Sequence, residues 1–139
     1  MRADTPAVAG CEAWATFDPD VLGGHYTGHH GQGPNVAIAV AQGAAANPIL
    51  VGVDVEKLAG FGHLYKVSPL ADSASPVLMG QIPGQPGEPI AWINTNKYGG
   101  RVFYTSLGHI DDFKQEPFNR LLVNALHWAT GTDRSRHAE

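Results

Sequence analysis

Two apolar runs joined by a glycine turn constrain the fold of this chain more than any other feature. The runs are residues 89–94 (Pro-Ile-Ala-Trp-Ile-Asn) and 101–105 (Arg-Val-Phe-Tyr-Thr), and the turn between them contains Gly99 and Gly100. Glycine takes the positive φ angles that a tight turn between antiparallel strands needs. The sequence therefore predicts an antiparallel hairpin, and the fold must contain a sheet built on it.

A helix is predicted after this hairpin, over residues 117–130. Apolar residues recur there at spacings of three and four, Pro117 lies in the first turn and Gly131 follows the end. Other runs of apolar and β-branched residues predict short extended segments at 35–40, 64–67 and 76–82, and a turn leading to a short extended segment at 47–53. Residues 1–33 are expected to be irregular, with one short helix around 13–22.

Length and charge limit the class of protein. A chain of 139 residues that is 43% hydrophobic holds one domain, expected over residues 1–131, with a charged tail at 132–139. The net charge of -4, with Lys and Arg scattered, argues against nucleic acid as a partner. No apolar run reaches the roughly 18 residues of a membrane span, so we expect a soluble, cytoplasmic chain without a membrane partner.

His109 follows the second run of the hairpin after a glycine, and this position makes it a site candidate. An imidazole at a strand end can transfer protons near neutral pH, and Asp111 or Asp112 can orient it. Two structural interpretations remain open: the histidine caps the next helix or binds a backbone carbonyl, and either aspartate caps that helix.

The segment 22–33 contains three histidines and five glycines in twelve residues, and we call it the Gly-His segment. Its glycines allow a tight backbone, while neutral imidazoles can bind zinc or a sugar hydroxyl. His25 and His29 are the candidates for a divalent metal, but they share a face only on a helix, and no cysteine or nearby carboxylate completes a closed site. A polar pocket loop and a plain structural turn are the alternatives.

Three further residues are weaker candidates. Cys11 is the one thiol and cannot form an internal disulfide, and its surroundings lack the strand-turn-helix pattern of an exposed nucleophile. His63 follows a glycine, and His127 lies on the predicted helix, where a surface or packing role is expected.

Four segments together resemble the ThuA-like (trehalose utilisation) family. They are Asp20–His29, Glu88–Trp92, Gly100–His109 and the helix from Phe118 to Trp128, and the resemblance covers about residues 14–131. It implies an α/β fold of the class I glutamine amidotransferase-like superfamily, a flavodoxin-like three-layer sheet of which this chain resembles the carboxyl-terminal portion without the first strands.

The resemblance also implies site residues. His109 and Asp111 occupy the places of the triad histidine and its acid, while the nucleophile of the amidotransferases has no counterpart, so glutamine hydrolysis is not expected. Carbohydrate metabolism (trehalose, another disaccharide or a keto-sugar) is expected instead, in a pocket lined by the Gly-His segment and His109. The residues expected to bind substrate are His25, Tyr26, His29, His30 and Ser106.

Three hypotheses follow for activity. The chain is a carbohydrate-processing enzyme that uses His109 as acid and base, a sugar-binding module without catalysis, or an inactive fragment of a larger ThuA-like protein. A sheet without its first strands exposes an edge, which another copy of the chain or a missing amino-terminal portion would cover.

Overall fold

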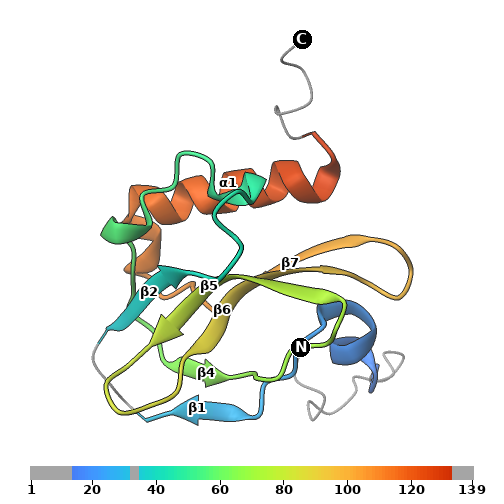
Figure 1. Ribbon diagram of the computed structural model, residues 1–139, viewed down its shortest axis with the longest axis horizontal. Helices are drawn as coiled ribbons and strands as arrows, with labels where there is room; N and C mark the ends of the chain where they lie inside the picture. Colours follow the sequence, from blue (N-terminus) through green and yellow to red (C-terminus); the bar gives the residue numbers. More distant parts are fainter. Residues whose placement is uncertain (1–13, 32–34, 133–139) are drawn as a thin grey trace.

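A five-stranded antiparallel sheet forms the middle layer of the molecule (Figure 1). The computed structural model describes residues 14–31 and 35–132. The strand order is β3-β2-β5-β6-β7, with β2 at Val36–Val40, β3 at Ala59–Gly60, β5 at Ala74–Gln81, β6 at Glu88–Thr95 and β7 at Arg101–Thr105. The predicted strands at 35–40 and 76–82 are thereby confirmed as β2 and β5.

The predicted hairpin is confirmed as β6 and β7. These strands pair in register from Ala91 opposite Thr105 to Thr95 opposite Arg101. In the turn, Gly99 has a φ of 81°, and the side chain of Asn96 accepts the backbone N–H groups of Tyr98 and Gly100.

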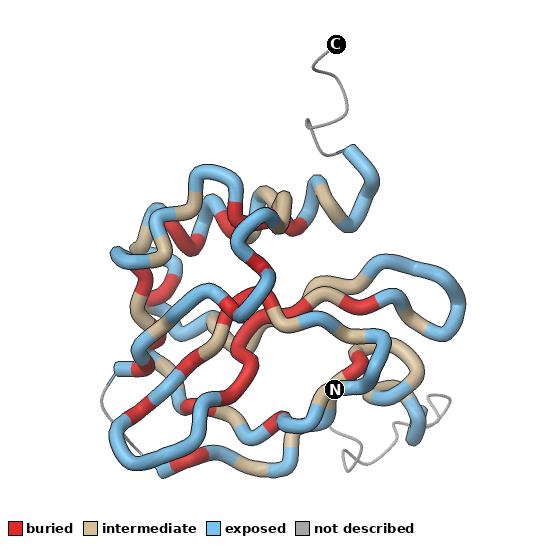
Figure 2. Tube along the Cα trace, viewed as in Figure 1, coloured by how far each residue is buried: buried red, intermediate tan, exposed pale blue. Residues whose placement is uncertain are grey.

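The predicted helix is α1, Glu116–Thr130, and it covers one face of the sheet (Figure 1). Phe118, Leu121 and Ala125 are buried and join a core with Leu78 and Ala91 of the sheet. The helix ends at Gly131, whose φ of 71° places it in the left-handed conformation of a helix cap. The first five residues of β6 are all buried, so both faces of this strand are covered by the neighbouring layers (Figure 2).

The opposite face of the sheet is covered by a two-stranded antiparallel sheet of β1 (Gly28–His30) and β4 (Leu64–Lys66) (Figure 1). The expectation that 28–30 is irregular was wrong. His30 lies opposite Leu64, and both side chains are buried, so pairing with β4 supplies the order that this glycine- and histidine-rich segment lacks by itself. The predicted strand at 64–67 is confirmed as β4.

Short helical turns occupy the remaining segments. The extended segment expected at 47–53 is instead the 3₁₀ helix η2 (Pro48–Leu50), because Asn47 accepts the backbone N–H of Ile49 and Pro48 suits a first helical position. The short helix expected around 13–22 is reduced to the π-helical turn η1 (Asp18–Leu22). The 3₁₀ helices η3 (Val55–Lys57) and η4 (Asp112–Lys114) complete the described elements.

The architecture is a sheet with helical and sheet layers on its two faces, which is compatible with the expected α/β class. All strand pairings among the described residues are antiparallel, whereas the centre of a flavodoxin-like sheet is parallel. Within residues 14–31 and 35–132, no helix has the length and apolar character that crossing a bilayer requires.

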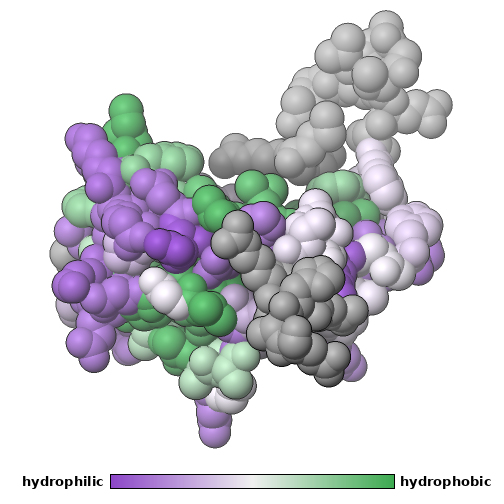
Figure 3. All heavy atoms as spheres, turned by 90° about the horizontal axis from the view of Figure 1, so that it is seen from above, coloured by the Kyte–Doolittle hydropathy of each residue, from purple (hydrophilic) through white to green (hydrophobic). Residues whose placement is uncertain are grey.

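The helical layer presents a mixed surface. Seen from the side of α1, hydrophobic side chains lie among hydrophilic ones (Figure 3). The exposed apolar residues on α1 and in the segment before it include Ile110, Phe113, Val123 and Leu126. The Gly-His segment belongs to the layer on the other side of the sheet.

Candidate functional site

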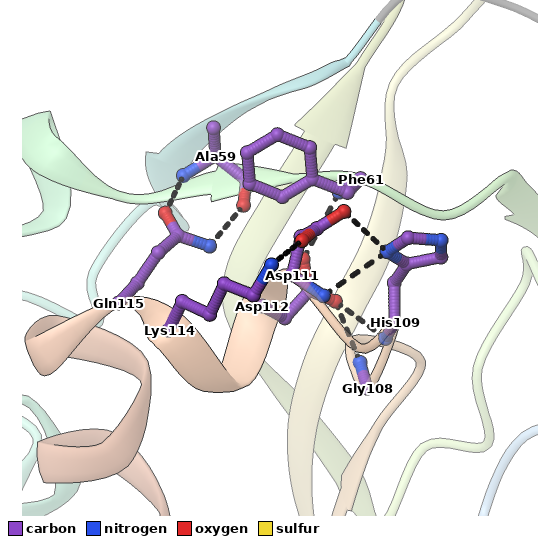
Figure 4. Close-up of polar contacts among 8 residues, drawn as sticks. All are labelled: Ala59, Phe61, Gly108, His109, Asp111, Asp112, Lys114 and Gln115. Carbon is purple, nitrogen blue, oxygen red and sulfur yellow. Dashed lines mark hydrogen bonds and ion pairs between the residues drawn. The ribbon is translucent and has the colours of Figure 1, made fainter.

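His109 lies in a tight turn directly after β7, and the buried carboxylate of Asp112 shapes this turn (Figure 4). Asp112 is 1% exposed. Its Oδ2 accepts the backbone N–H groups of Gly108 and His109 at 2.7 and 2.8 Å. Its Oδ1 accepts the backbone N–H of Phe61 at 3.0 Å, which joins the turn to the segment after β3. The Asp112 carboxylate therefore holds the turn through three backbone N–H groups.

Neither aspartate caps α1, which was one of the open interpretations. Gln115 occupies the position before the helix, and its side chain binds the backbone N–H and C=O of Ala59 instead (Figure 4). Asp112 caps the His109 turn, and Asp111 interacts with His109 and Lys114.

The His109 imidazole is accessible and weakly paired. Its Nδ1 lies 3.5 Å from Asp111 Oδ2 and accepts the backbone N–H of Asp111 at 3.2 Å, while Nε2 points away from these residues (Figure 4). Asp111 binds Lys114 Nζ more closely, at 2.6 Å, and this hydrogen bond is the main reason that the pKa of Asp111 lies below its usual value. The imidazole is 44% exposed and can reach a ligand.

The Gly-His segment begins with two glycines that approach the sheet closely. A Cβ on Gly23 would lie 2.8 Å from the Asn94 side chain, and one on Gly24 would lie 2.6 Å from the Trp92 ring. Trp92 Nε1 and Asn94 Nδ2 donate to the backbone carbonyls of Leu22 and Val21. These contacts fix the segment against β6 and explain the Gly-Gly pair structurally.

His25 is paired with Asp18, a residue that the sequence reasoning missed. Nδ1 of His25 lies 2.5 Å from Oδ2 of Asp18, on the adjoining η1 turn. The imidazole is 62% exposed. Burial, and after it the charges of Tyr65 and Asp18, raise the pKa of the Tyr104 hydroxyl.

The outward face of β1 and β4 carries a run of aromatic rings. Tyr26 packs edge-to-face on Tyr65 at 4.8 Å and its hydroxyl lies 3.2 Å from His29 Nδ1, while His29 stacks on His63 at 4.9 Å. Phe61 alternates with His63 and Tyr65 along its segment and lies 6.4 Å from the His109 ring. We call these six residues the aromatic row: Tyr26, His29, Phe61, His63, Tyr65 and His109.

His30 faces the opposite way from His29, into the protein. It is 8% exposed, and its Nε2 lies 3.0 Å from Glu88 Oε1 while Nδ1 lies 3.1 Å from Gln85 Oε1. The other Glu88 oxygen accepts the backbone N–H groups of Val67 and Ser68. Burial opposes the charged form of Glu88, but the bonds from His30, Ser68 and Val67 outweigh it and lower the pKa of the carboxyl.

Both ring nitrogens of His30 are thus engaged inside the protein, which favours a structural role over the expected substrate contact. The hydroxyl of Ser106 also turns to the protein, toward the carbonyl of Ile90 at 3.5 Å. His25 and His29 bind different partners, and no group of three metal-ligating side chains forms within the part of the chain that the structure describes.

The remaining candidates lie away from the aromatic row or outside the described residues. His127, on the surface of α1, has its Nδ1 3.0 Å from the hydroxyl of Thr132. Cys11 falls outside the described residues. Sequence reasoning missed Glu88 and Tyr65 as partners, although Glu88 lies in a segment already singled out and Tyr65 in a predicted strand.

The sheet, the buried Glu88 and the strand-end His109 all lie within the part of the chain that one family model matches. The chain belongs to the ThuA family, described as trehalose utilisation, whose model matches residues 6–129. No curated protein and no solved structure matches the chain significantly. Membership indicates a role related to trehalose utilisation.

Proposed function

We propose that the chain binds a sugar of trehalose metabolism along the aromatic row, with His109 as the acid and base residue and Asp111 as its neighbouring carboxylate. The observation that carries this proposal is the row itself, whose ring contacts form two sets, Tyr65–Tyr26–His29–His63 and Phe61–His109, joined along the chain by the two-residue step from Phe61 to His63. Ligand sites combine aromatic surface with a few placed polar groups, and a disaccharide or keto-sugar offers both apolar C–H faces and hydroxyls.

The proposed ligand contacts are His25, Tyr26 and His29 on the Gly-His segment. The sheet would then be the antiparallel margin of a flavodoxin-like domain, because the described strands pair only antiparallel. Sugar chemistry is favoured over glutamine hydrolysis because the family is described by trehalose utilisation.

A sugar-binding module without catalysis is the second candidate. It is favoured by the geometry at Asp111, whose carboxylate lies nearer to Lys114 than to His109, at 2.6 against 3.5 Å. A carboxylate neutralised in this way gives an imidazole less support than the direct bond of a catalytic pair.

His109→Ala tests the proposal, with His127→Ala as the matched control on α1. The main-chain N–H of His109, rather than its imidazole, binds Asp112, so the variant should keep the melting temperature while losing trehalose binding in calorimetry or turnover of an oxidised disaccharide. Unfolding of His109→Ala, or unchanged binding, would contradict the proposal. If His109→Ala loses binding and the wild type shows no turnover, the second candidate, a sugar-binding module without catalysis, is selected.

A further inference from the structure

Asp18 and His25 form a further carboxylate–imidazole pair, of which the proposed function uses only His25, as a ligand contact. The 2.5 Å separation of Oδ2 and Nδ1 is shorter than the 3.5 Å of the Asp111–His109 pair. The Asp18 side chain is 19% exposed, and His25 is 62% exposed with no other contact among the described residues. The carboxylate is therefore held by the protein while the far side of the ring faces outward.

This bond determines where His25 carries its proton. A carboxylate only accepts hydrogen bonds, so Nδ1 of His25 must donate. A neutral imidazole has one N–H, which leaves Nε2 as a bare acceptor on the outward side of the ring.

His109 has the opposite arrangement. Its Nδ1 accepts the backbone N–H of Asp111 at 3.2 Å, and the Asp111 carboxylate is directed to Lys114. The neutral ring then carries its proton on Nε2, the nitrogen that points away from the turn (Figure 4). The two accessible histidines thus present an acceptor and a donor.

Both histidines border the aromatic row. His25 directly precedes Tyr26 in the chain, so the Asp18–His25 pair adjoins the Tyr26–Tyr65 end. His109 lies at the other end, next to Phe61.

We propose that Asp18 and His25 form a hydrogen-bond-accepting subsite for a ligand hydroxyl, complementary to the hydrogen-bond-donating His109 at the other end of the aromatic row. The proposal rests on the proposed function for the nature of the ligand, a polyhydroxylated sugar, whose hydroxyls can both donate and accept. Asp18 is a positioning residue here, since it acts through His25.

Long-range ¹H–¹⁵N correlation spectra of the imidazoles test the assignment directly in the ligand-free full chain. They are recorded at a pH at which the ¹⁵N shifts themselves show both rings to be neutral. We expect His25 to carry its proton on Nδ1 and His109 on Nε2. A His25 ring protonated on Nε2 would overturn the proposal.

Asp18→Ala adds a second readout, with Asp20→Ala as the control on the same η1 turn. Asp20 binds Thr16 and Lys97 rather than a histidine. In Asp18→Ala, the His25 ring should no longer be held in its Nδ1–H form, whereas in Asp20→Ala its tautomer should not change. An unaltered His25 tautomer in Asp18→Ala overturns the positioning role of Asp18. The wild-type spectrum still decides the assignment if a variant fails to fold.

Titration with trehalose separates this proposal from the proposed function. We expect the ring signals of His25 and His109 to shift and those of His127 to stay in place. Shifts at His109 without shifts at His25 would overturn the subsite and leave the proposed function standing. Unmoved signals at both rings would overturn both the proposed function and the ligand role of the subsite. The tautomer assignment would not be affected, because it comes from the ligand-free spectra.

Discussion

Two of the carboxylate–imidazole pairs among the described residues have similar chemistry but lie in opposite surroundings. His30 and Glu88 lie 3.0 Å apart with side chains 8% and 7% exposed. His109 and Asp111 lie 3.5 Å apart with side chains 44% and 37% exposed. In the buried pair, both ring nitrogens and both carboxylate oxygens have protein partners, whereas the exposed pair leaves one ring nitrogen directed outward.

Burial accounts for this difference. A polar atom without a partner inside a protein costs about 1–3 kcal/mol, so a buried histidine is stable only when its nitrogens are engaged. Such a histidine has no ring nitrogen available to bind a ligand. The adjacent residues His29 and His30 show this on one short strand, since His29 faces outward along the aromatic row and His30 faces the core.

The largest effect on stability is expected for Asp112→Ala, which removes the carboxylate that holds the His109 turn but leaves the His109 and Asp111 side chains in place. It removes the acceptor of three backbone N–H groups, those of Phe61, Gly108 and His109. We expect a loss of about 2–4 kcal/mol in the free energy of unfolding, measured by urea denaturation. Glu116→Ala, at an exposed carboxylate on α1, is the control, and an equal loss in both variants would show that Asp112 does not hold the turn.

Glu88→Gln should have a smaller effect that depends on pH. The pKa of Glu88 in the folded protein lies below its ordinary 4.5, because the bonds from His30, Ser68 and Val67 outweigh the opposing effect of burial. The ionised carboxylate therefore stabilises the fold above about pH 4.5, and this contribution is lost as the pH falls through the folded pKa. We expect Glu88→Gln to lose about 2 kcal/mol at neutral pH.

The decisive measurement is the free energy of unfolding of both proteins between about pH 7 and about pH 3. The difference between wild type and Glu88→Gln should shrink as the pH falls. Glu116→Gln serves as the control, because Glu116 is exposed and its ion pair with Arg120 is on the helix surface. A difference that stays constant across this range would mean that the charge of Glu88 does not stabilise the fold.

The elements predicted correctly are those whose signals are local. The hairpin of β6 and β7 follows from two apolar runs around a Gly-Gly turn, and α1 follows from its periodicity between Pro117 and Gly131. The strand β1 was missed because Gly-His-His has no strand propensity of its own, and its order comes from pairing with β4, more than thirty residues later in the chain. The antiparallel pairing of the whole described sheet also depends on such distant partners.

The same distinction holds for the site. His109 and Asp111 were predicted together because they are two residues apart. Glu88 pairs with His30 across 58 positions, and nothing in the sequence around either residue indicates the other. Asp18 and His25 are only seven residues apart, but η1 and the tight Gly23–Gly24 contact with β6 bring them together, and neither feature has a recognisable sequence pattern.

The smallest effect is expected for Asp111→Asn, which tests the exposed pair itself. Stability should not change measurably, because the side chain is exposed and its bond to Lys114 is a surface ion pair. The substitution leaves the Asp111 backbone N–H in place, and this group still donates to His109 Nδ1. Trehalose affinity or turnover should therefore fall by less than about tenfold, which is a smaller loss than in His109→Ala. Calorimetry and activity assays on the two variants, with Asp54→Asn as an exposed control, measure this ratio. If Asp111→Asn is as inactive as His109→Ala, the carboxylate orients the imidazole as in a catalytic triad, and the proximity of Lys114 does not weaken that support.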